Sequence, residues 1–203
     1  MPIKLILRTH ANINLFRDIL IETACSKIGD KILICSGFFQ KRANYSAELE
    51  DNFIDRFKLT KKSIITIGIH NGTWKKDYER FVNEFKNKGI SITSYIYSGY
   101  RWHSKIYLLL ENNIPIFGII GSSNITRNAF SLSAPFNIES DVILWEENKK
   151  ISNIINEKFN NIDINNYYSL DYNIETNKNV TIKDRLEYLY NDIMKLSSKF
   201  KIV

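Results

Sequence analysis

The sequence WHSKIY, residues 102–107, begins the segment around which the chain is organised, and GSSN, residues 121–124, answers it downstream. His103 and Lys105 stand two positions apart in a run rich in Ile, Tyr and Leu, so on a strand both side chains leave the same face. An imidazole titrates near neutral pH and can act as nucleophile or proton donor, and a neighbouring ammonium favours the charge that gathers on a phosphate. The pair therefore fits phosphoryl chemistry without a metal ion.

Strands and helices alternate on both sides of this segment. Apolar runs predict strands, and apolar side chains at helical spacing predict helices between them. The predicted strands cover residues 3–7, 31–39, 63–69, 90–97, 105–110, 116–120 and 138–145. Asn112-Asn113 is expected as the turn of a hairpin. This alternation predicts an α/β fold, a three-layer α/β/α sandwich with a mixed, largely parallel sheet.

The last part of the chain changes in character. After residue 160 the sequence is rich in Asn, Asp and Tyr and has no clear periodicity. Thr181 to Asp184 then predicts a capping box, and apolar residues recur at helical steps as far as Phe200. The apolar face of this helix needs a partner, which is its own domain, a second subunit or a further domain. The expected divisions are a domain over residues 1–160, a linker or loop over 161–180 and a C-terminal helix over 181–203.

Composition sets broad limits on function. The 203 residues carry a formal net charge of +6, which favours a polyanion such as nucleic acid or an acidic membrane surface, although a mildly basic protein also fits. The two cysteines, Cys25 and Cys35, are too few for a disulfide framework and are expected to be reduced core residues. The N-terminus does not fit a signal peptide, and no apolar run reaches membrane-spanning length. We therefore expect a cytoplasmic protein.

The two motifs together resemble the signature of the phospholipase D superfamily, which is His-x-Lys followed a strand later by Gly-Ser-x-x-Asn or a close variant. The family also has a Glu further on in an Asn-x-Glu-like stretch, and residues 137–139 lie in the matching place and order. The fuller motif has an acid five positions after the Lys, where this chain has Leu110, with Glu111 one place later. Metal-independent, phospholipase D-like type II restriction endonucleases also tend to lack that acid. The resemblance covers roughly the first three quarters of the chain and favours the nuclease branch over the lipases.

The resemblance implies a role for each motif residue. His103 attacks phosphorus and forms a phosphohistidine, and a second His protonates the leaving oxygen. Lys105 and Asn124 hold the phosphate oxygens. Glu139 orients an imidazole, a role for which Asp141 on the same strand face is the alternative.

The two serines between these motifs are candidate phosphate ligands. A short helix expected over residues 125–130 would begin with free amides at Ser122 and Ser123, and such a helix start binds anions. Helix capping alone would also explain either serine.

Basic and aromatic residues near the motifs are candidate DNA contacts. Isolated basic side chains are usually solvated surface, and aromatic side chains are more often core than base-stacking platforms. The basic candidates are Arg101, Arg127, Lys41 and Arg42, and the aromatic candidates are Phe38, Phe39, Tyr100 and Trp102.

A metal site is the alternative use of the histidines. His10 and His70 each follow a predicted strand, and with His103 they would give three imidazole ligands. Neither a His-x-x-x-His spacing nor an acidic cluster supports this alternative, and phosphohistidine chemistry needs no metal. We expect no metal and no other cofactor.

The chain has one His-x-Lys motif, whereas the superfamily's chemistry uses two imidazoles in one cleft. A symmetric homodimer supplies the second. The sequence therefore predicts a homodimeric, metal-independent DNA endonuclease, of restriction type, that does not act at a membrane. A phospholipid phosphodiesterase and a catalytically idle nucleic-acid-binding or docking module are the alternatives. No helix-turn-helix or zinc motif is visible, so DNA recognition is expected on a separate domain or subunit.

Overall fold

The computed structural model describes residues 2–39, 41–42, 45–68, 73–97, 103–147, 149–160 and 162–203. Nine strands form one sheet in the order β10-β1-β9-β8-β7-β2-β5-β6-β11. These strands are β1 (Pro2–Arg8), β2 (Lys31–Ser36), β5 (Ser63–Gly68), β6 (Ile92–Tyr97), β7 (Lys105–Glu111), β8 (Ile114–Gly121), β9 (Glu139–Trp145), β10 (Tyr167–Asp171) and β11 (Phe200–Ile202). A separate pair is formed by β3 (Lys41–Arg42) and β4 (Tyr45–Ser46).

Helices connect most of these strands. The α-helices are α1 (Leu15–Cys25), α2 (Phe53–Lys58), α3 (Thr73–Asn87), α4 (Arg127–Phe130), α5 (Lys149–Phe159) and α6 (Ile182–Lys195). Short 3-10 segments are η1 (Ala47–Asn52), η2 (Ile164–Asn166) and η3 (Leu196–Lys199). No helix within the described ranges combines the length and the apolar character needed to cross a membrane.

The sheet is mixed but mostly antiparallel, which corrects the prediction of a largely parallel sheet. Among the described strands, the two parallel pairs are β2 with β5 and β5 with β6. The β7–β8 hairpin lies beside β2, β9 follows antiparallel to β8, and β1 pairs antiparallel with β9. Strand–helix alternation is typical of parallel neighbours, but it does not exclude later strands between β1 and β2. Here β9 and the β7–β8 hairpin lie between them, and each of these strands pairs antiparallel with its neighbours.

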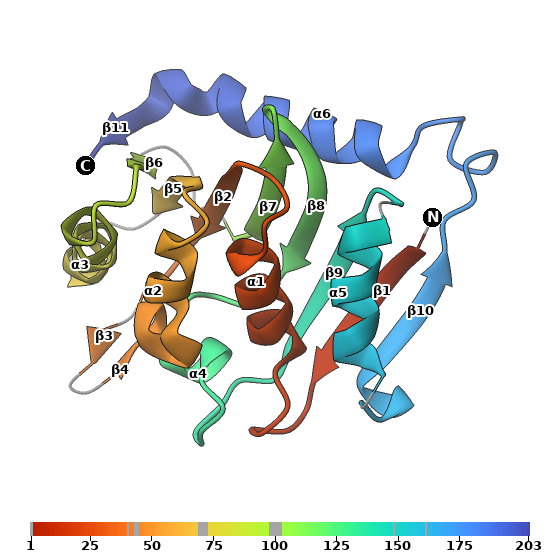
Figure 1. Ribbon diagram of the computed structural model, residues 1–203, viewed down its shortest axis with the longest axis horizontal. Helices are drawn as coiled ribbons and strands as arrows, with labels where there is room; N and C mark the ends of the chain where they lie inside the picture. The colour runs from red at the N-terminus through yellow and green to blue at the C-terminus, as the bar shows by residue number, and fades with distance from the viewer. Residues whose placement is uncertain are drawn as a thin grey trace.

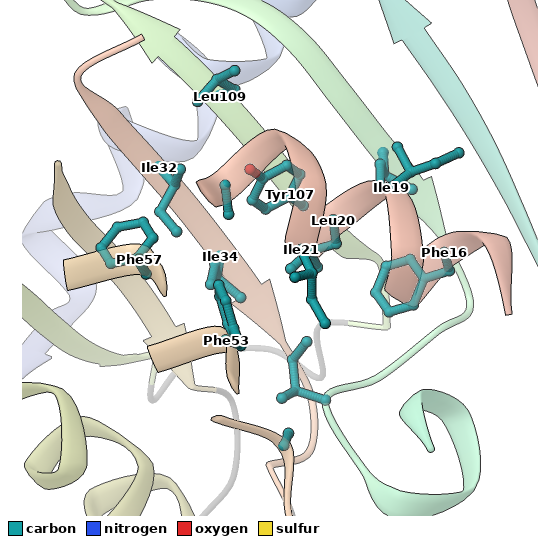
Figure 2. Close-up of a cluster of buried hydrophobic side chains, with 14 of the residues drawn as sticks. Phe16, Ile19, Leu20, Ile21, Ile32, Ile34, Phe53, Phe57, Tyr107 and Leu109 are labelled. Carbon is teal, nitrogen blue, oxygen red and sulfur yellow. The ribbon is translucent and has the colours of Figure 1, made fainter. Parts of the chain in front are cut away.

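Helices cover both faces of the sheet, as the sequence predicted. Figure 1 shows α1, α2 and α5 in front of the strands and α6 running along the upper end of the molecule. The core between α1, α2 and the sheet is apolar, and Figure 2 shows Leu20 and Ile21 of α1 beside Tyr107 of β7. A second core lies on the other face, where Leu186 of α6 reaches Gly118 so closely that a β-carbon there would lie 2.8 Å from its side chain.

The C-terminal residues complete the sheet. The stretch expected as a linker or loop contains β10, which pairs antiparallel with β1 at one sheet edge. Most β10 side chains are exposed, including the apolar Tyr168 and Leu170, so no buried face marks this edge strand in the sequence. The capping box of Thr181 and Asp184 is present as predicted, and the buried face of α6 packs on its own sheet. β11 then pairs with β6 at the opposite edge.

The hairpin turn is also as predicted. Asn112 and Asn113 both have positive φ, 54° and 65°. Two consecutive residues of this kind favour the tight turns that match the twist of the flanking strands. The hairpin places the start of β7 beside the end of β8, and Lys105 is the register partner of Gly121.

Candidate active site

The strand directions bring both motifs to the same end of the central strands, the edge of the sheet at which β2 and β8 end. β2 and β8 end there, and β7 and β9 begin there, because β7 is antiparallel to both β2 and β8 and β9 is antiparallel to β8. His103 and Lys105 stand at the start of β7, residues 121–124 at the end of β8, and Glu139 at the start of β9. The β3–β4 hairpin and α4 lie at this same end, low in Figure 1.

His103 and Lys105 form the more open half of this site. His103 is exposed and lies two residues before the first residue of β7, Lys105, which is half-buried. The Lys105 Nζ donates to the His103 carbonyl oxygen at 2.6 Å. Burial lowers the pKa of the Lys105 ammonium, and the negative charges of Glu139 and Asp141 act in the opposite direction. Lys105 shares its face with Tyr107, so it lies on the side of the sheet that α1 covers.

Asn124 is held by the end of β2. Its Oδ1 accepts hydrogen bonds from the Phe38 amide at 3.1 Å and from the Ser36 hydroxyl at 3.3 Å. The amide of Ile125 donates to the same Ser36 hydroxyl at 3.2 Å. Because Oδ1 is used within the protein, Nδ2 is the group that Asn124 can offer to a phosphate oxygen.

Glu139 is buried and bound on both carboxylate oxygens. The Ser122 hydroxyl donates to Oε2, and Asn137 Nδ2 donates to Oε1 at 2.9 Å. Arg8 is its register partner on β1. Burial lowers the pKa of Arg8, and the charge of Glu139 acts in the opposite direction, so the two are electrostatic partners. The Arg8 guanidinium donates to three carbonyl groups, including Ser131 at 2.6 Å and Asn128 at 2.9 Å, which fixes the loop after α4 beside the site.

Asp141 is a second buried carboxylate, two residues after Glu139 on the same face of β9. The Ser123 hydroxyl donates to Oδ2 at 2.6 Å and the Ser123 amide donates to Oδ1 at 3.2 Å. Burial raises the pKa of Asp141 to about 6, against the lowering effect of the two Ser123 hydrogen bonds and with a further raising effect of Glu139. Two consecutive serines thus each bind one carboxylate of β9.

The serines do not start a helix, which corrects the expected helix start. α4 begins at Arg127 and has four residues. The Ser122 amide donates to the Ser140 carbonyl at 3.1 Å, as β8 and β9 continue to pair, and the Ser123 amide is bound by Asp141. These amides are therefore not free N-terminal amides of a helix. A phosphate contact of either serine stays a prediction. To donate to a phosphate, a serine hydroxyl would have to leave the carboxylate that it now binds.

The basic DNA-contact candidates lie on separate elements. Arg127 is exposed at the start of α4, at the site end of the sheet. Lys41 and Arg42 form β3, whose backbone pairs with β4. Arg101 lies outside the described residues, as do the aromatic candidates Tyr100 and Trp102.

The other aromatic candidates differ from each other. Phe39 is buried in the core against Tyr78 and Phe81, so it follows the core alternative. Phe38 is half-buried, with its ring edge-on to Trp74 at a centroid distance of 4.9 Å. Its position beside Asn124 places it near the site.

The two described histidines of the metal alternative, His10 and His103, lie next to different strands. His10 follows β1, which β9 and β8 separate from the β7 strand of His103. Three strand spacings put the strands that carry them about 14 Å apart. His70 lies outside the described residues. Within the part of the chain that the structure describes, no three His, Cys, Asp or Glu side chains gather as a metal site would require.

Two further residues of the site, Ser36 and Arg8, were not predicted from the sequence. Ser36 ends β2 and joins the Asn124 segment to that strand through its hydroxyl. Arg8 ends β1 and faces Glu139. A charged residue closing an apolar strand was a weak signal for Arg8, but its partner follows only from the β1–β9 pairing. No pattern in the sequence singles out Ser36.

The chain matches a known protein family. Residues 13–176 match the family described as the NgoFVII restriction endonuclease N-terminal PLD domain. The chain belongs to this family. The predicted resemblance to the phospholipase D superfamily is thereby confirmed, and the candidate site described above lies within a PLD domain.

Solved structures share the fold of this PLD domain. Nuc, a phospholipase D family member from Salmonella typhimurium, superposes with a TM-score of 0.50 at 15% identity, covering 85% of this chain and 100% of Nuc. The phosphatidylserine synthase of Haemophilus influenzae Rd KW20 gives a TM-score of 0.52 at 12% identity, covering 97% of this chain and 46% of the synthase. The chain thus spans less than half the length of that enzyme. A search of the curated proteins finds no match to this chain.

Proposed function

We propose that this PLD domain is a metal-independent DNA endonuclease of restriction type that works through a phosphohistidine, in a site shared by two subunits. The supporting observation is that His103, Lys105, Asn124 and Glu139 lie at one sheet edge, in a chain of a restriction endonuclease domain family. Each supplies a group that phosphoryl transfer uses: a nucleophile, a cation, an amide donor and a carboxylate that orients an imidazole.

The proposed first step forms a bond between an imidazole nitrogen of His103 and phosphorus. The bond from phosphorus to the leaving oxygen breaks, and a second, protonated imidazole gives its proton to that oxygen. Lys105 and the Nδ2 of Asn124 hold the non-bridging oxygens, where negative charge gathers. The Lys105 Nζ donates to the His103 carbonyl, so it lies next to the residue that is proposed to attack the phosphate.

The proposed second step returns the enzyme to its starting state. The second imidazole, now neutral, takes a proton from water, and the water oxygen attacks phosphorus. The bond between phosphorus and nitrogen breaks, and its electron pair returns to His103. The products are a phosphate monoester end and a free hydroxyl end, and the protons balance without any metal ion.

The second imidazole is proposed to be His103 of a second copy of the chain. His10 is the other described histidine; it follows β1, about 14 Å in strand spacings from β7, and its Nδ1 pairs with the Thr9 hydroxyl. His103 is exposed at the sheet edge, so a two-fold axis at this edge can bring two copies together around one phosphate.

Charge supports a DNA substrate. The net charge of +6 favours a polyanion, and exposed Arg127 lies at the site end of the sheet. Binding should weaken with salt, with a log-log slope of about −0.9 per phosphate neutralised. Sequence recognition is proposed to lie on another domain or subunit.

Cleavage of supercoiled plasmid in EDTA tests the proposal. The wild-type protein and the His10→Ala protein should both cut, and the His103→Ala protein should not. Loss of cutting in EDTA with rescue by magnesium would refute the mechanism. Salt-sensitive DNA binding without cleavage would select the idle binding module, and release of a headgroup from phospholipid vesicles without DNA cleavage would select the lipid phosphodiesterase.

Mixed dimers test the shared site. If both His103 residues serve one phosphate, a dimer of wild-type and His103→Ala subunits lacks either the nucleophile or the acid. Equal random mixing leaves about a quarter of the dimers wholly wild type, so activity per total protein should fall to about a quarter. Independent sites would keep about a half. Subunit exchange is checked with tagged subunits.

A further inference from the structure

Asp141 stands in one row with Lys105 across three neighbouring strands. Lys105 of β7 is the register partner of Gly121 of β8, and Gly121 is the register partner of Asp141 of β9. Register partners present their side chains on the same face of a sheet. Lys105 and Asp141 therefore flank a position that has no side chain.

The carboxylate of Asp141 fills the place of that missing side chain. A β-carbon at Gly121 would lie 2.1 Å from the Asp141 Oδ1 and 2.5 Å from the Ser140 carbonyl oxygen. Real β-carbons do not approach other atoms so closely, so a side chain at position 121 would displace the carboxylate. Glycine here lets Asp141 reach over β8, toward the strand of Lys105.

Two cations lie near Asp141: Lys105 of β7 in the same row, and Arg8 of β1, which lines the same cavity as Asp141. Burial lowers the pKa of Lys105, and the charges of Glu139 and of Asp141 on β9 both act against that lowering. On the neighbouring strand β1, Arg8 is the register partner of Glu139, and α1 contributes the apolar Leu15 and Phe16 to the cavity beside Asp141.

Asp141 also holds the segment that carries Asn124. Its two oxygens bind the amide and the hydroxyl of Ser123, the residue directly before Asn124. The other side of the segment is held by Ser36, which binds the Ile125 amide. Asn124 is therefore fixed between two anchors, of which Asp141 is the charged one.

We infer that Asp141 is a positioning residue of this site, which anchors the Asn124 segment through Ser123 and sets a negative charge beside Lys105. This inference rests on the proposed function in assigning phosphate binding to Lys105 and Asn124. It gives Asp141 a task different from that of Glu139, whose oxygens are bound by Ser122 and Asn137. Asp141 acts through Lys105 and Asn124 and does not contact the substrate itself.

The test replaces the charge and keeps the shape, with Asp141→Asn. In protein labelled with 13C-lysine, the resonance of Lys105, assigned by its loss in Lys105→Arg, should titrate at a lower pH than in wild type. The turnover of plasmid cleavage should fall by about tenfold or more with KM little changed, because a misplaced phosphate ligand acts on the transition state. Asp30→Asn, which removes one charge at the opposite end of the sheet, should change neither.

A second variant separates the anchor from the charge. Ser123→Ala keeps the carboxylate and removes one of its two bonds to the segment. Above pH 7 it should lower turnover and leave the Lys105 titration close to that of wild type. An unchanged Lys105 titration in Asp141→Asn, or unchanged turnover in both variants, would overturn the inference. If the wild-type protein cleaves no DNA, the proposed function fails, and the Lys105 titration still decides whether Asp141 acts on this lysine.

Discussion

The two halves of the site are built in opposite ways. The His-Lys half, His103 and Lys105, is exposed or half-buried, and the two residues contact each other through a carbonyl group. The serine-carboxylate half, residues 122–124 with Glu139 and Asp141, is bound at each carboxylate oxygen by a serine or asparagine. One half is accessible to a substrate, and the other is fixed by folding.

This difference indicates a division of tasks. A group that must form and break a covalent bond needs access and freedom to turn, whereas groups that hold charge in place act best when they are already oriented. The fixed half also has a cost to stability, because burial raises the pKa of Asp141 to about 6. Substitutions in the two halves should therefore separate into losses of chemistry and changes of stability.

The largest expected effect is that of His103→Ala. It removes the proposed nucleophile, so single-turnover plasmid cleavage should slow by about 10⁵-fold. The side chain is exposed, so thermal unfolding should stay close to that of wild type. His10→Ala is the matched control, since His10 is also exposed. Equal losses in the two variants would remove the distinction between them and with it the nucleophile assignment.

Lys105→Ala should show the next largest effect. Its charge is proposed to stabilise the transition state, so turnover should fall by about 10³-fold. The Kd for DNA measured by fluorescence anisotropy should rise much less, because one phosphate contact among several is lost. Lys31→Ala, at the opposite end of the sheet, is the control. Equal losses in turnover and binding would make Lys105 an ordinary phosphate contact.

Asn124 belongs to the fixed half and should show a mixed effect. Asn124→Ala removes the proposed donor to phosphate and also the acceptor of the Phe38 and Ser36 bonds, so turnover should fall by about 10²-fold with a loss of stability. Asn124→Asp keeps an acceptor and should unfold closer to wild type while remaining as slow. Asn128→Ala is the control on α4. A fast Asn124→Asp enzyme would contradict the proposed role of Nδ2.

The smallest expected effect concerns the stability of Asp141→Asn. The folded pKa of Asp141, about 6, lies above its ordinary value of 3.8, so the folded state holds this proton more tightly than the unfolded state does. The stability from the protonated form is complete below pH 3.8 and is lost as pH rises through 6. At pH 7 the substitution should therefore raise the free energy of unfolding, by at most about 3 kcal/mol.

Urea unfolding at several pH values measures this effect. The difference between Asp141→Asn and wild type should be present at pH 7 and should disappear toward pH 4. Asp30→Asn, whose side chain is exposed, should show no such pH dependence. A destabilised Asp141→Asn protein at pH 7 would mean that the Ser123 bonds outweigh the burial of the charge, and the contrast between the two halves would lose its energetic basis.

The sequence by itself determined the family and the residues that define it. The His-x-Lys motif, the residues 121–124 and Glu139 are local patterns, and their order along the chain is visible without a structure. The hairpin turn at Asn112 and Asn113 and the capping box of α6 are also local, since each depends on residues within four positions.

Only the tertiary structure decided the direction of the sheet, the place of β10 and the partners of the site. The bonds of Ser122 and Ser123 to β9, of Arg8 to the loop after α4 and of Ser36 to Asn124 join residues from 17 to 123 positions apart. Such pairs depend on which strands become neighbours and in which register, and the hydrophobic pattern of each strand gives its buried face but not its neighbour. Strand pairing therefore brings the motif residues and their partners together, and a single sequence does not show which strands pair.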